Sequence, residues 1–202
     1  MRKLPVIAAT CALLGFMTTA LAAGDAAAGK QKAAACVACH GADGNSANGE
    51  WPKLAGQNVK YLVKQLHEFK AGDRANPIMS GMAAPLSDQD MVDLAAYYVN
   101  QKVAPGEADP QLVEAGQALY KGGNLASGVS ACMACHGPNG AGIPEGGFPS
   151  IAGQHAQYTE TQLKAFRSMQ RANDPGQMMR NIAMKMTDAE IKAVASYIQG
   201  LH

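Results

Sequence analysis

Apolar residues recur along this chain at the three- and four-residue spacing of α-helices, and runs of β-branched residues are few. Two segments show the i, i+3, i+4, i+7 pattern of a buried helix face: Met91, Leu94, Ala95 and Tyr98 in the first, and Ile191, Val194, Ala195 and Ile198 in the second. Each segment follows a capping-box sequence, which begins at Ser87 or at Thr187. The pattern therefore predicts an all-α fold.

Each half of the chain is expected to contain three main helices. Their expected ranges are 25–36, 59–70 and 88 onward in the first half, and 110–121, 155–169 and 188 onward in the second. Pro110 suits the first turn of its helix, where a missing N–H costs nothing, and Asp109 before it is expected to be the N-cap.

The two halves of the chain are copies of one unit. Residues 36–40 match residues 132–136 at an offset of 96, and residues 51–57 match residues 148–154 at an offset of 97. Five further residues match at the second offset: Tyr61 with Tyr158, Leu66 with Leu163, Phe69 with Phe166, Arg74 with Arg171, and Asn76 with Asn173.

A short linker is expected between the two units, at residues 101–109, which include a Pro-Gly pair and few side chains that pack. This division predicts a first domain at residues 23–104 and a second at residues 105–202. The second unit has the longer loops, among them an extra segment at residues 122–130. We therefore expect the surroundings of equivalent sites in the two units to differ.

The sequence Cys-X-X-Cys-His occurs once in each unit, as Cys36-Val37-Ala38-Cys39-His40 and Cys132-Met133-Ala134-Cys135-His136. It is the attachment signature of a c-type haem, in which two thioether bonds hold the porphyrin and the histidine binds the iron. A thioredoxin-like motif would need a βαβ context, and a zinc site would need four ligands close together. The sequence predicts two covalently bound haem c groups on Cys36, Cys39, Cys132 and Cys135, with His40 and His136 as axial ligands.

A methionine opposite each histidine would close the iron and suit electron transfer, whereas an open position would bind peroxide or gas. The chain has 11 methionines, and most methionines in proteins are core filler. Met79 and Met179 both lie eight residues before the Ser87 or Thr187 cap, and no other methionine position is shared. We expect these two to be the axial ligands. Four others are expected to pack near the haem edges: Met82, Met178, Met184 and Met186. Of these, Met82 and Met178 are the alternative ligands.

The remaining histidines do not form a repeated pair. At the offset of 97, His67 corresponds to Lys164 and His155 to Asn58. Ligation by two histidines at each iron is therefore not supported, and these residues, with His202, are interpreted as surface histidines.

A ligating histidine usually donates its other ring N–H to a fixed acceptor. Pro52 and Pro149 each sit between an aromatic residue and a repeated x-Leu/Ile-Ala-Gly sequence. Each proline carbonyl is a candidate for that acceptor, and a simple rigid turn is an equally good interpretation of the residues alone.

The first residues are typical of a secretory signal peptide. A short basic start precedes an apolar run at residues 4–21, and residues 20–22 fit the small-x-small cleavage rule. A retained membrane anchor is the alternative, but the apolar run is short for one. Removal of residues 1–22 would take Cys11 away and leave the four motif cysteines.

Charge and composition narrow the choice of partners. The full chain carries a net charge of +1, and the loss of Arg2 and Lys3 leaves 15 basic against 16 acidic residues. There is no basic run, so nucleic-acid binding has no support. With only 4 Phe and 1 Trp, domains of this size would be marginal without the apolar surface that a haem brings.

On these residues, the chain resembles the class I cytochromes c, and specifically the dihaem cytochrome c4 family. The resemblance rests on both haem motifs, the Pro-x-Leu/Ile-Ala-Gly-Gln segments, the Met79 and Met179 loops and the capped terminal helices. It implies two all-α domains, each of about three main helices wrapped round a haem, with haems facing each other near the interface. It implies His/Met ligation, with the Pro52 and Pro149 carbonyls holding the histidines. It also implies close helix crossings at two pairs: Gly29 with Tyr97, and Gly116 with Tyr197.

The family resemblance implies a periplasmic electron carrier of a respiratory chain with no small-molecule substrate. Its donor would be a membrane quinol-oxidising complex or another redox protein, and its acceptor a terminal oxidase or another redox protein, with loose membrane association in some members. The alternatives are a haem subunit of a periplasmic dehydrogenase and a dihaem peroxidase. A peroxidase needs acid–base groups beside an open iron, and no such constellation accompanies either motif.

Overall fold

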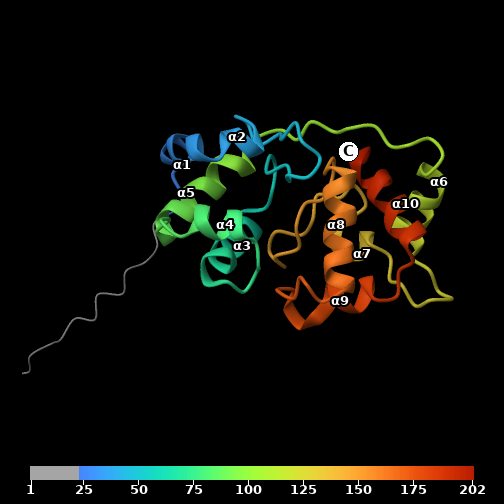
Figure 1. Cartoon of the computed structure of the whole chain (residues 1–202). Coiled ribbons are helices and arrows are strands. Elements are labelled where there is room, and N and C mark those ends of the chain that lie inside the picture. Colours follow the sequence, from blue (N-terminus) through green and yellow to red (C-terminus); the bar gives the residue numbers. More distant parts are fainter. Residues whose placement is uncertain (1–22) are drawn as a thin grey trace, which may run out of the picture.

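The computed structural model describes residues 23–202, and the expected signal peptide, its alternative as a membrane anchor and Cys11 all fall outside the described residues. The described chain forms two helical lobes joined by a single linker (Figure 1). The first lobe holds α1 (Ala26–Lys32), the 3₁₀ turn η1 (Ala33–Ala35), α2 (Val37–His40), α3 (Val59–Ala71), α4 (Pro77–Ala83) and α5 (Asp88–Val99). The second lobe holds α6 (Val113–Gly122), α7 (Met133–His136), α8 (Ala156–Arg167), the 3₁₀ turn η2 (Pro175–Gln177), α9 (Met178–Ala183) and α10 (Asp188–Gln199).

Both capping boxes are present, which confirms the expected starts of α5 and α10. Ser87 Oγ accepts the Asp90 N–H at 3.2 Å, and Asp90 Oδ2 accepts the Ser87 N–H at 2.8 Å. Thr187 and Glu190 make the same two bonds at the same distances. These reciprocal bonds satisfy amide groups that a helix start leaves without partners, so they fix where each helix begins.

The first and third main helices of each lobe cross at the expected glycines. A Cβ atom on Gly29 would lie 2.0 Å from a carbonyl oxygen of α5 and 3.0 Å from Tyr97 Cβ. A Cβ atom on Gly116 would lie 2.3 Å from a carbonyl oxygen of α10 and 2.6 Å from Tyr197 Cβ. Neither position has room for a side chain, so the glycines set the close approach of α1 to α5 and of α6 to α10.

The start of α6 differs from the expectation, because the helix begins at Val113 and not at Pro110. Asp109 Oδ1 accepts the Gln111 N–H at 2.8 Å, which makes a turn in place of the expected N-cap. The Asp109 N–H donates to Ser196 Oγ on α10 at 2.8 Å. Asp109 is therefore bound to α10 and opens a turn, and the regular helix follows after that turn.

Two short helices were not expected from the sequence pattern. Helix α4 has seven residues and α9 has six, too few for a periodic apolar pattern to be recognised. They carry Met79 and Met179. Helix α8 also ends two residues before residue 169, because Met169 adopts a left-handed conformation with φ of 62°.

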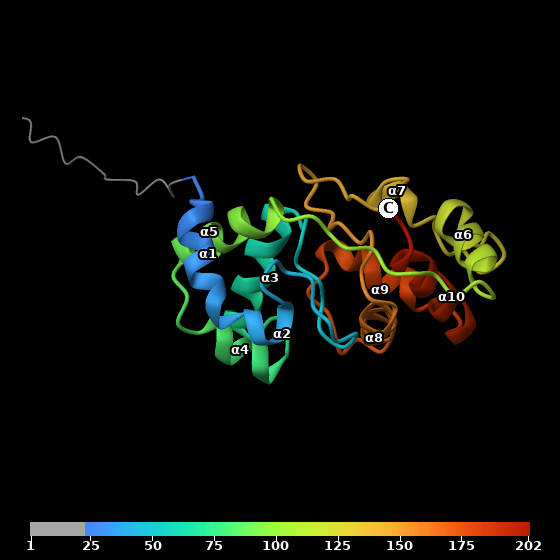
Figure 2. The ribbon, with the colours of Figure 1, turned by 90° about the horizontal axis from the view of Figure 1, so that it is seen from above.

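The linker makes more contacts than its sequence predicts. It runs across both lobes, as Figure 2 shows from above. The Ala104 N–H donates to Asn45 Oδ1 at 2.9 Å in the first lobe, and the Gly106 N–H donates to the Gln199 carbonyl at 2.9 Å in the second. The linker is therefore attached to each lobe by backbone hydrogen bonds, although few of its side chains pack.

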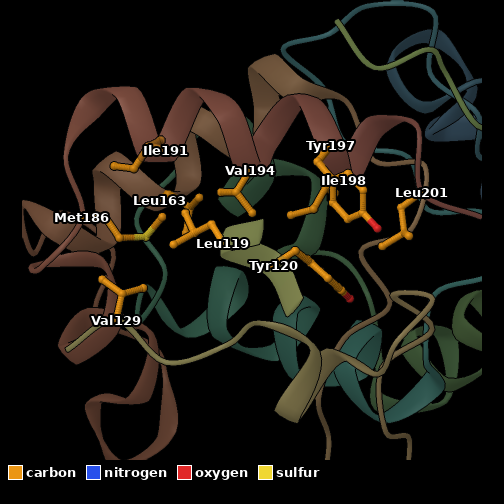
Figure 3. Close-up of a cluster of buried hydrophobic side chains, with 10 residues drawn as sticks. All are labelled: Leu119, Tyr120, Val129, Leu163, Met186, Ile191, Val194, Tyr197, Ile198 and Leu201. Atoms are coloured by element: carbon orange, nitrogen blue, oxygen red, sulfur yellow. The ribbon is translucent and has the colours of Figure 1, made fainter. Parts of the chain in front are cut away.

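The two lobes have separate apolar cores of unequal size. The second is the larger and centres on the fully buried side chains of Tyr120 and Ile191 (Figure 3). The first consists of six buried residues: Ala33, Leu62, Leu94, Ala95, Tyr97 and Tyr98. None of the helices in residues 23–202 has the length and apolar character needed to cross a membrane.

Candidate functional site

Each Cys-X-X-Cys-His motif forms one tight helical turn. The His40 N–H donates to the Cys36 carbonyl at 2.9 Å, and the His136 N–H donates to the Cys132 carbonyl at 3.0 Å. The four cysteines lie in α2 and α7 or directly before them, are half-buried, and are not paired in disulfides. Burial raises the pKa of the Cys36 thiol, and it raises that of Cys132 to about 11. The thiols of Cys36 and Cys132 are therefore uncharged at neutral pH.

Both motif histidines are buried and held at one ring nitrogen. Nδ1 of His40 donates to the Pro52 carbonyl at 2.8 Å, and Nδ1 of His136 donates to the Pro149 carbonyl at 3.0 Å. Burial lowers the pKa of both rings. A neutral ring with its proton on Nδ1 leaves the Nε2 lone pair free to bind iron.

Backbone bonds close the loop between each histidine and its proline. The Gly44 carbonyl accepts the Leu54 N–H at 2.7 Å in the first lobe, and the Gly140 carbonyl accepts the Ile151 N–H at 2.7 Å in the second. Both glycines have positive φ, 82° and 74°, so the sharp turn needs a residue without a side chain. This closure brings each proline carbonyl to its histidine ring.

Met79 and Met179 occupy equivalent, half-buried positions in α4 and α9, each four residues before a fully buried alanine that ends the helix. The helix starts are held differently. Asn76 Oδ1 accepts the Met79 N–H at 2.9 Å, whereas in the second lobe Asp174 binds Arg180. Of the methionines expected near the haem edges, three are exposed and Met186 belongs to the second core: the exposed ones are Met82, Met178 and Met184.

One buried polar atom of the first lobe has no partner within the described residues. The Tyr98 hydroxyl lies beside Cys36, and burial raises its pKa well above the usual value. Its counterpart in the repeat is Ile198, so this hydroxyl is a difference between the two sites. An unpaired hydroxyl beside a haem-attachment cysteine fits a site that is completed by a further group.

Two buried guanidinium groups lie between the lobes. Arg74 and Arg171 are each 8% exposed, and no carboxylate lies within ion-pair distance of either one in residues 23–202. Arg74 donates to Tyr158 at 2.8 Å, and Arg171 donates to Tyr61 at 3.0 Å. Buried charges normally require a counter-charge, and the two propionates of a haem are groups of that kind. The residues present therefore fit the haem that the motifs predict.

The surface interpretation of His155 is wrong. Its Nε2 atom lies 2.8 Å from the carbonyl oxygen and 2.9 Å from the hydroxyl oxygen of Ser46, in the other lobe. His202 is exposed as expected, and His67 is partly exposed at the surface. Sequence reasoning also assigned no role to Gln57 and Gln154, which bond across the lobes, although both belong to the repeated segment and the repeat itself was the available signal.

Comparisons with known proteins agree with this architecture. The cytochrome c family model matches the chain twice, over residues 26–102 and 113–202. Cytochrome c4 from Pseudomonas aeruginosa is 53% identical over 190 residues, which cover 94% of each chain. A thiosulfate dehydrogenase electron acceptor from Thiomonas intermedia is 43% identical over 178 residues, covering 85% of this chain and 81% of that protein. The crystal structure of reduced recombinant cytochrome c4 from Pseudomonas stutzeri, 50% identical, has a TM-score of 0.87 and covers 89% of this chain and 100% of that one.

The motifs, the duplicated fold and these likenesses confirm the resemblance seen in the sequence. The chain has two tandem cytochrome c domains and carries two haem c groups on Cys36, Cys39, Cys132 and Cys135. Each haem supplies a one-electron Fe(III)/Fe(II) couple, while the protein binds and shields it. The peroxidase alternative is not supported, since the relatives named cytochrome c4 are electron carriers. The chain belongs to the cytochrome c4 family, and it is a dihaem electron-transfer protein.

Proposed function

We propose that this electron carrier works in the periplasm with His40 and Met79 on the first iron and His136 and Met179 on the second. The observation that carries the proposal is the duplicated geometry of the histidines. In both lobes a buried, neutral ring is fixed through Nδ1 by a proline carbonyl. Closed irons of this kind exchange electrons and leave no position for a substrate.

The methionine assignment is supported by the alignment of α4 with α9. Counted from the buried alanine that ends each helix, only one position has methionine in both lobes: Met79 and Met179. Met82 corresponds to Ile182, and Met178 corresponds to Ile78, which is 67% exposed. The two alternative ligands therefore have no methionine counterpart in the other lobe.

An optical spectrum of the oxidised protein tests the ligands. Met79→Ala and Met179→Ala should each remove about half of the methionine-to-iron charge-transfer band, since one of two closed irons is opened. Met82→Ala and Met178→Ala are the matched controls and should leave the band intact. Full intensity in either of the first two variants would overturn that assignment.

The periplasmic location is supported by the signal sequence at residues 1–22 and by the family. We place the boundary between the domains at residues 104 and 105, inside the linker that joins the two family matches. Cell fractionation with intact-mass measurement of the purified protein tests the location. A periplasmic species that starts near Ala23 and carries two haems is expected, and a haem-free or uncleaved chain in the cytoplasm would contradict it.

We infer that the protein accepts electrons from a quinol-oxidising complex and delivers them toward a terminal oxidase, with loose attachment to the membrane. A second role is favoured by the likeness to a thiosulfate dehydrogenase electron acceptor, namely service to a periplasmic dehydrogenase. Reconstitution separates the two. Reduction by membranes with quinol, followed by oxygen uptake, supports the respiratory role, whereas reduction only by a dehydrogenase and its substrate supports the second.

A further inference from the structure

The peptide group that joins Pro52 to Lys53 is hydrogen-bonded at both ends, each time to a different lobe. Its carbonyl accepts from Nδ1 of His40 at 2.8 Å, within the first lobe. Its N–H donates to Oε1 of Gln154 at 2.9 Å, in the second lobe. Gln154 also donates through Nε2 to the Lys53 carbonyl at 3.0 Å, so its amide binds both backbone groups of one residue.

The equivalent peptide group of the second lobe shows the same arrangement with the lobes exchanged. The Pro149 carbonyl accepts from Nδ1 of His136 at 3.0 Å, and the Ser150 N–H donates to Oε1 of Gln57 at 2.8 Å. Gln57 donates through Nε2 to the Ser150 carbonyl at 2.7 Å. Each lobe thus supplies the glutamine that binds the histidine-holding peptide of the other lobe.

The two glutamines are themselves held firmly. Gln57 is 6% exposed and Gln154 is 8% exposed. Oε1 of each also accepts the next N–H of its own chain, from Asn58 at 2.9 Å or from His155 at 3.0 Å. Those two residues are the N-caps of α3 and α8, so each glutamine side chain is fixed to a helix start.

The residue before each proline is also linked to the other lobe, directly at Phe148 and through Ser46 at Trp51. Asn58 Nδ2 donates to the Phe148 carbonyl at 2.7 Å. On the other side, His155 contacts Ser46, whose hydroxyl donates to the Trp51 carbonyl at 2.6 Å. Each proline segment is therefore held on both flanks by bonds that lead to the opposite lobe.

A hydrogen bond to the N–H of a peptide group strengthens its carbonyl as an acceptor, because the two ends of the group polarise together. A stronger acceptor on Nδ1 makes an iron-bound imidazole more basic. A more basic ligand stabilises the more highly charged Fe(III) form and lowers the reduction potential. A glutamine of one lobe can in this way set the potential of the haem in the other.

We propose that Gln57 and Gln154 are positioning residues, each acting on the histidine of the other lobe. Gln154 acts on His40 through the Pro52–Lys53 peptide, and Gln57 acts on His136 through the Pro149–Ser150 peptide. The proposal rests on the proposed axial roles of the two histidines. It gives the tandem arrangement a function beyond placing two haems in one chain, since neither domain alone contains the complete support of its own histidine.

The test is a redox titration of the holoprotein in which the NMR signals of each haem are followed separately. Gln154→Leu removes the acceptor without changing charge. It should raise the reduction potential of the haem on Cys36 and Cys39 by about 28 mV. This shift corresponds to a change of about threefold in the Fe(III)/Fe(II) equilibrium, at about 59 mV per tenfold. Gln57→Leu should shift the other haem by a similar amount. The ring Nδ1–H signal of His40 should change in Gln154→Leu, and that of His136 should change in Gln57→Leu.

Gln157→Ala is the matched control. This glutamine is uncharged and also reaches the other lobe, where its side chain lies against Gly49, but within residues 23–202 it makes no hydrogen bond to either proline segment. It should move neither potential. A shift in the haem of the substituted lobe, an equal shift in both haems, or no shift with unchanged Nδ1–H signals would overturn the proposal.

A second pair of variants and the wild-type spectrum make each result interpretable. If a leucine variant fails to fold, Gln154→Asn and Gln57→Asn shorten the side chain and keep its polarity, and the same exchanged pattern is expected. The wild-type spectrum tests the axial ligands separately. A missing methionine-to-iron band would count against the proposed ligation, whereas an intact band with unmoved potentials would count against the exchanged glutamines alone.

Discussion

Asp174 and Arg180 form an ion pair that spans the turn before α9. Asp174 Oδ1 lies 2.7 Å from Arg180 Nε, and Asp174 Oδ2 accepts the Arg180 N–H at 3.0 Å. The two side chains are only 4% and 16% exposed. The first lobe has no such pair, and Asn76 caps α4 in its place. The two methionine-bearing helices are thus held by unequal means.

Replacement of Asp174 by alanine should therefore disturb the second domain selectively. It leaves Arg180 without its partner and should cost about 3 kcal/mol of unfolding free energy. Denaturant unfolding measures the loss, and the methionine-to-iron band shows whether Met179 stays in place. Asn76→Ala is the matched change in the first domain, with an expected cost of about 1 kcal/mol from a lost cap. Equal costs for the two variants would contradict the reading of the pair as a buried ionic anchor.

The helix crossing at Gly116 predicts a strong effect from a single methyl group. Gly116→Ala would place Cβ 2.3 Å from a backbone oxygen of α10, so α6 has to move away, at a cost of about 2 kcal/mol. Thermal unfolding checks this. Gly122→Ala, in the same helix with nothing within 4 Å, should be neutral or slightly stabilising. Tolerance of alanine at Gly116 would show that the crossing is looser than described.

The capping box of α5 predicts a loss of stability in acid. Hydrogen bonds from Lys32 and then from Ser87 lower the pKa of Asp90 from 3.8 to about 2. A carboxylate with a depressed folded-state pKa contributes stability that is complete above pH 3.8 and is lost as the pH falls through about 2. Asp90→Asn should be less stable than wild type at neutral pH, and the two unfolding midpoints should converge below pH 2. A constant difference across this range would exclude the carboxylate as the cause.

The buried Arg74 predicts coupling between the unfolding of the two domains. Arg74→Leu removes the bonds to Tyr158 and Gln162 of the other lobe and the bond to Gln65 of its own lobe, at a cost of about 3 kcal/mol. Calorimetry should show one joint transition in wild type and two separated transitions in the variant. Tyr158→Phe removes a single bond and should cost about 1 kcal/mol without separating them. A wild type that already unfolds in two independent steps would contradict the coupling.

Features that depend on nearby residues could be predicted from the sequence. The Cys-X-X-Cys-His turns and the two capping boxes follow from spacings within one motif. The crossings at Gly29 and Gly116 were implied by the family resemblance. Two features of the helices were not predicted, for different reasons. Helices α4 and α9 are too short to show a period, and the turn at Asp109 depends on Ser196, which is far away in the sequence.

The sequence by itself determined that the chain carries two haems in two copies of one all-α unit, because thioether attachment and helix capping use residues only a few positions apart. It also pointed to Pro52 and Pro149 without deciding between an acceptor and a turn. Only the tertiary structure decided that Gln57 and Gln154 exchange partners. Each repeat offers the same glutamine and the same proline segment, so the sequence is compatible with pairing inside a domain or between domains. The packing of the two lobes selects the pairing between them.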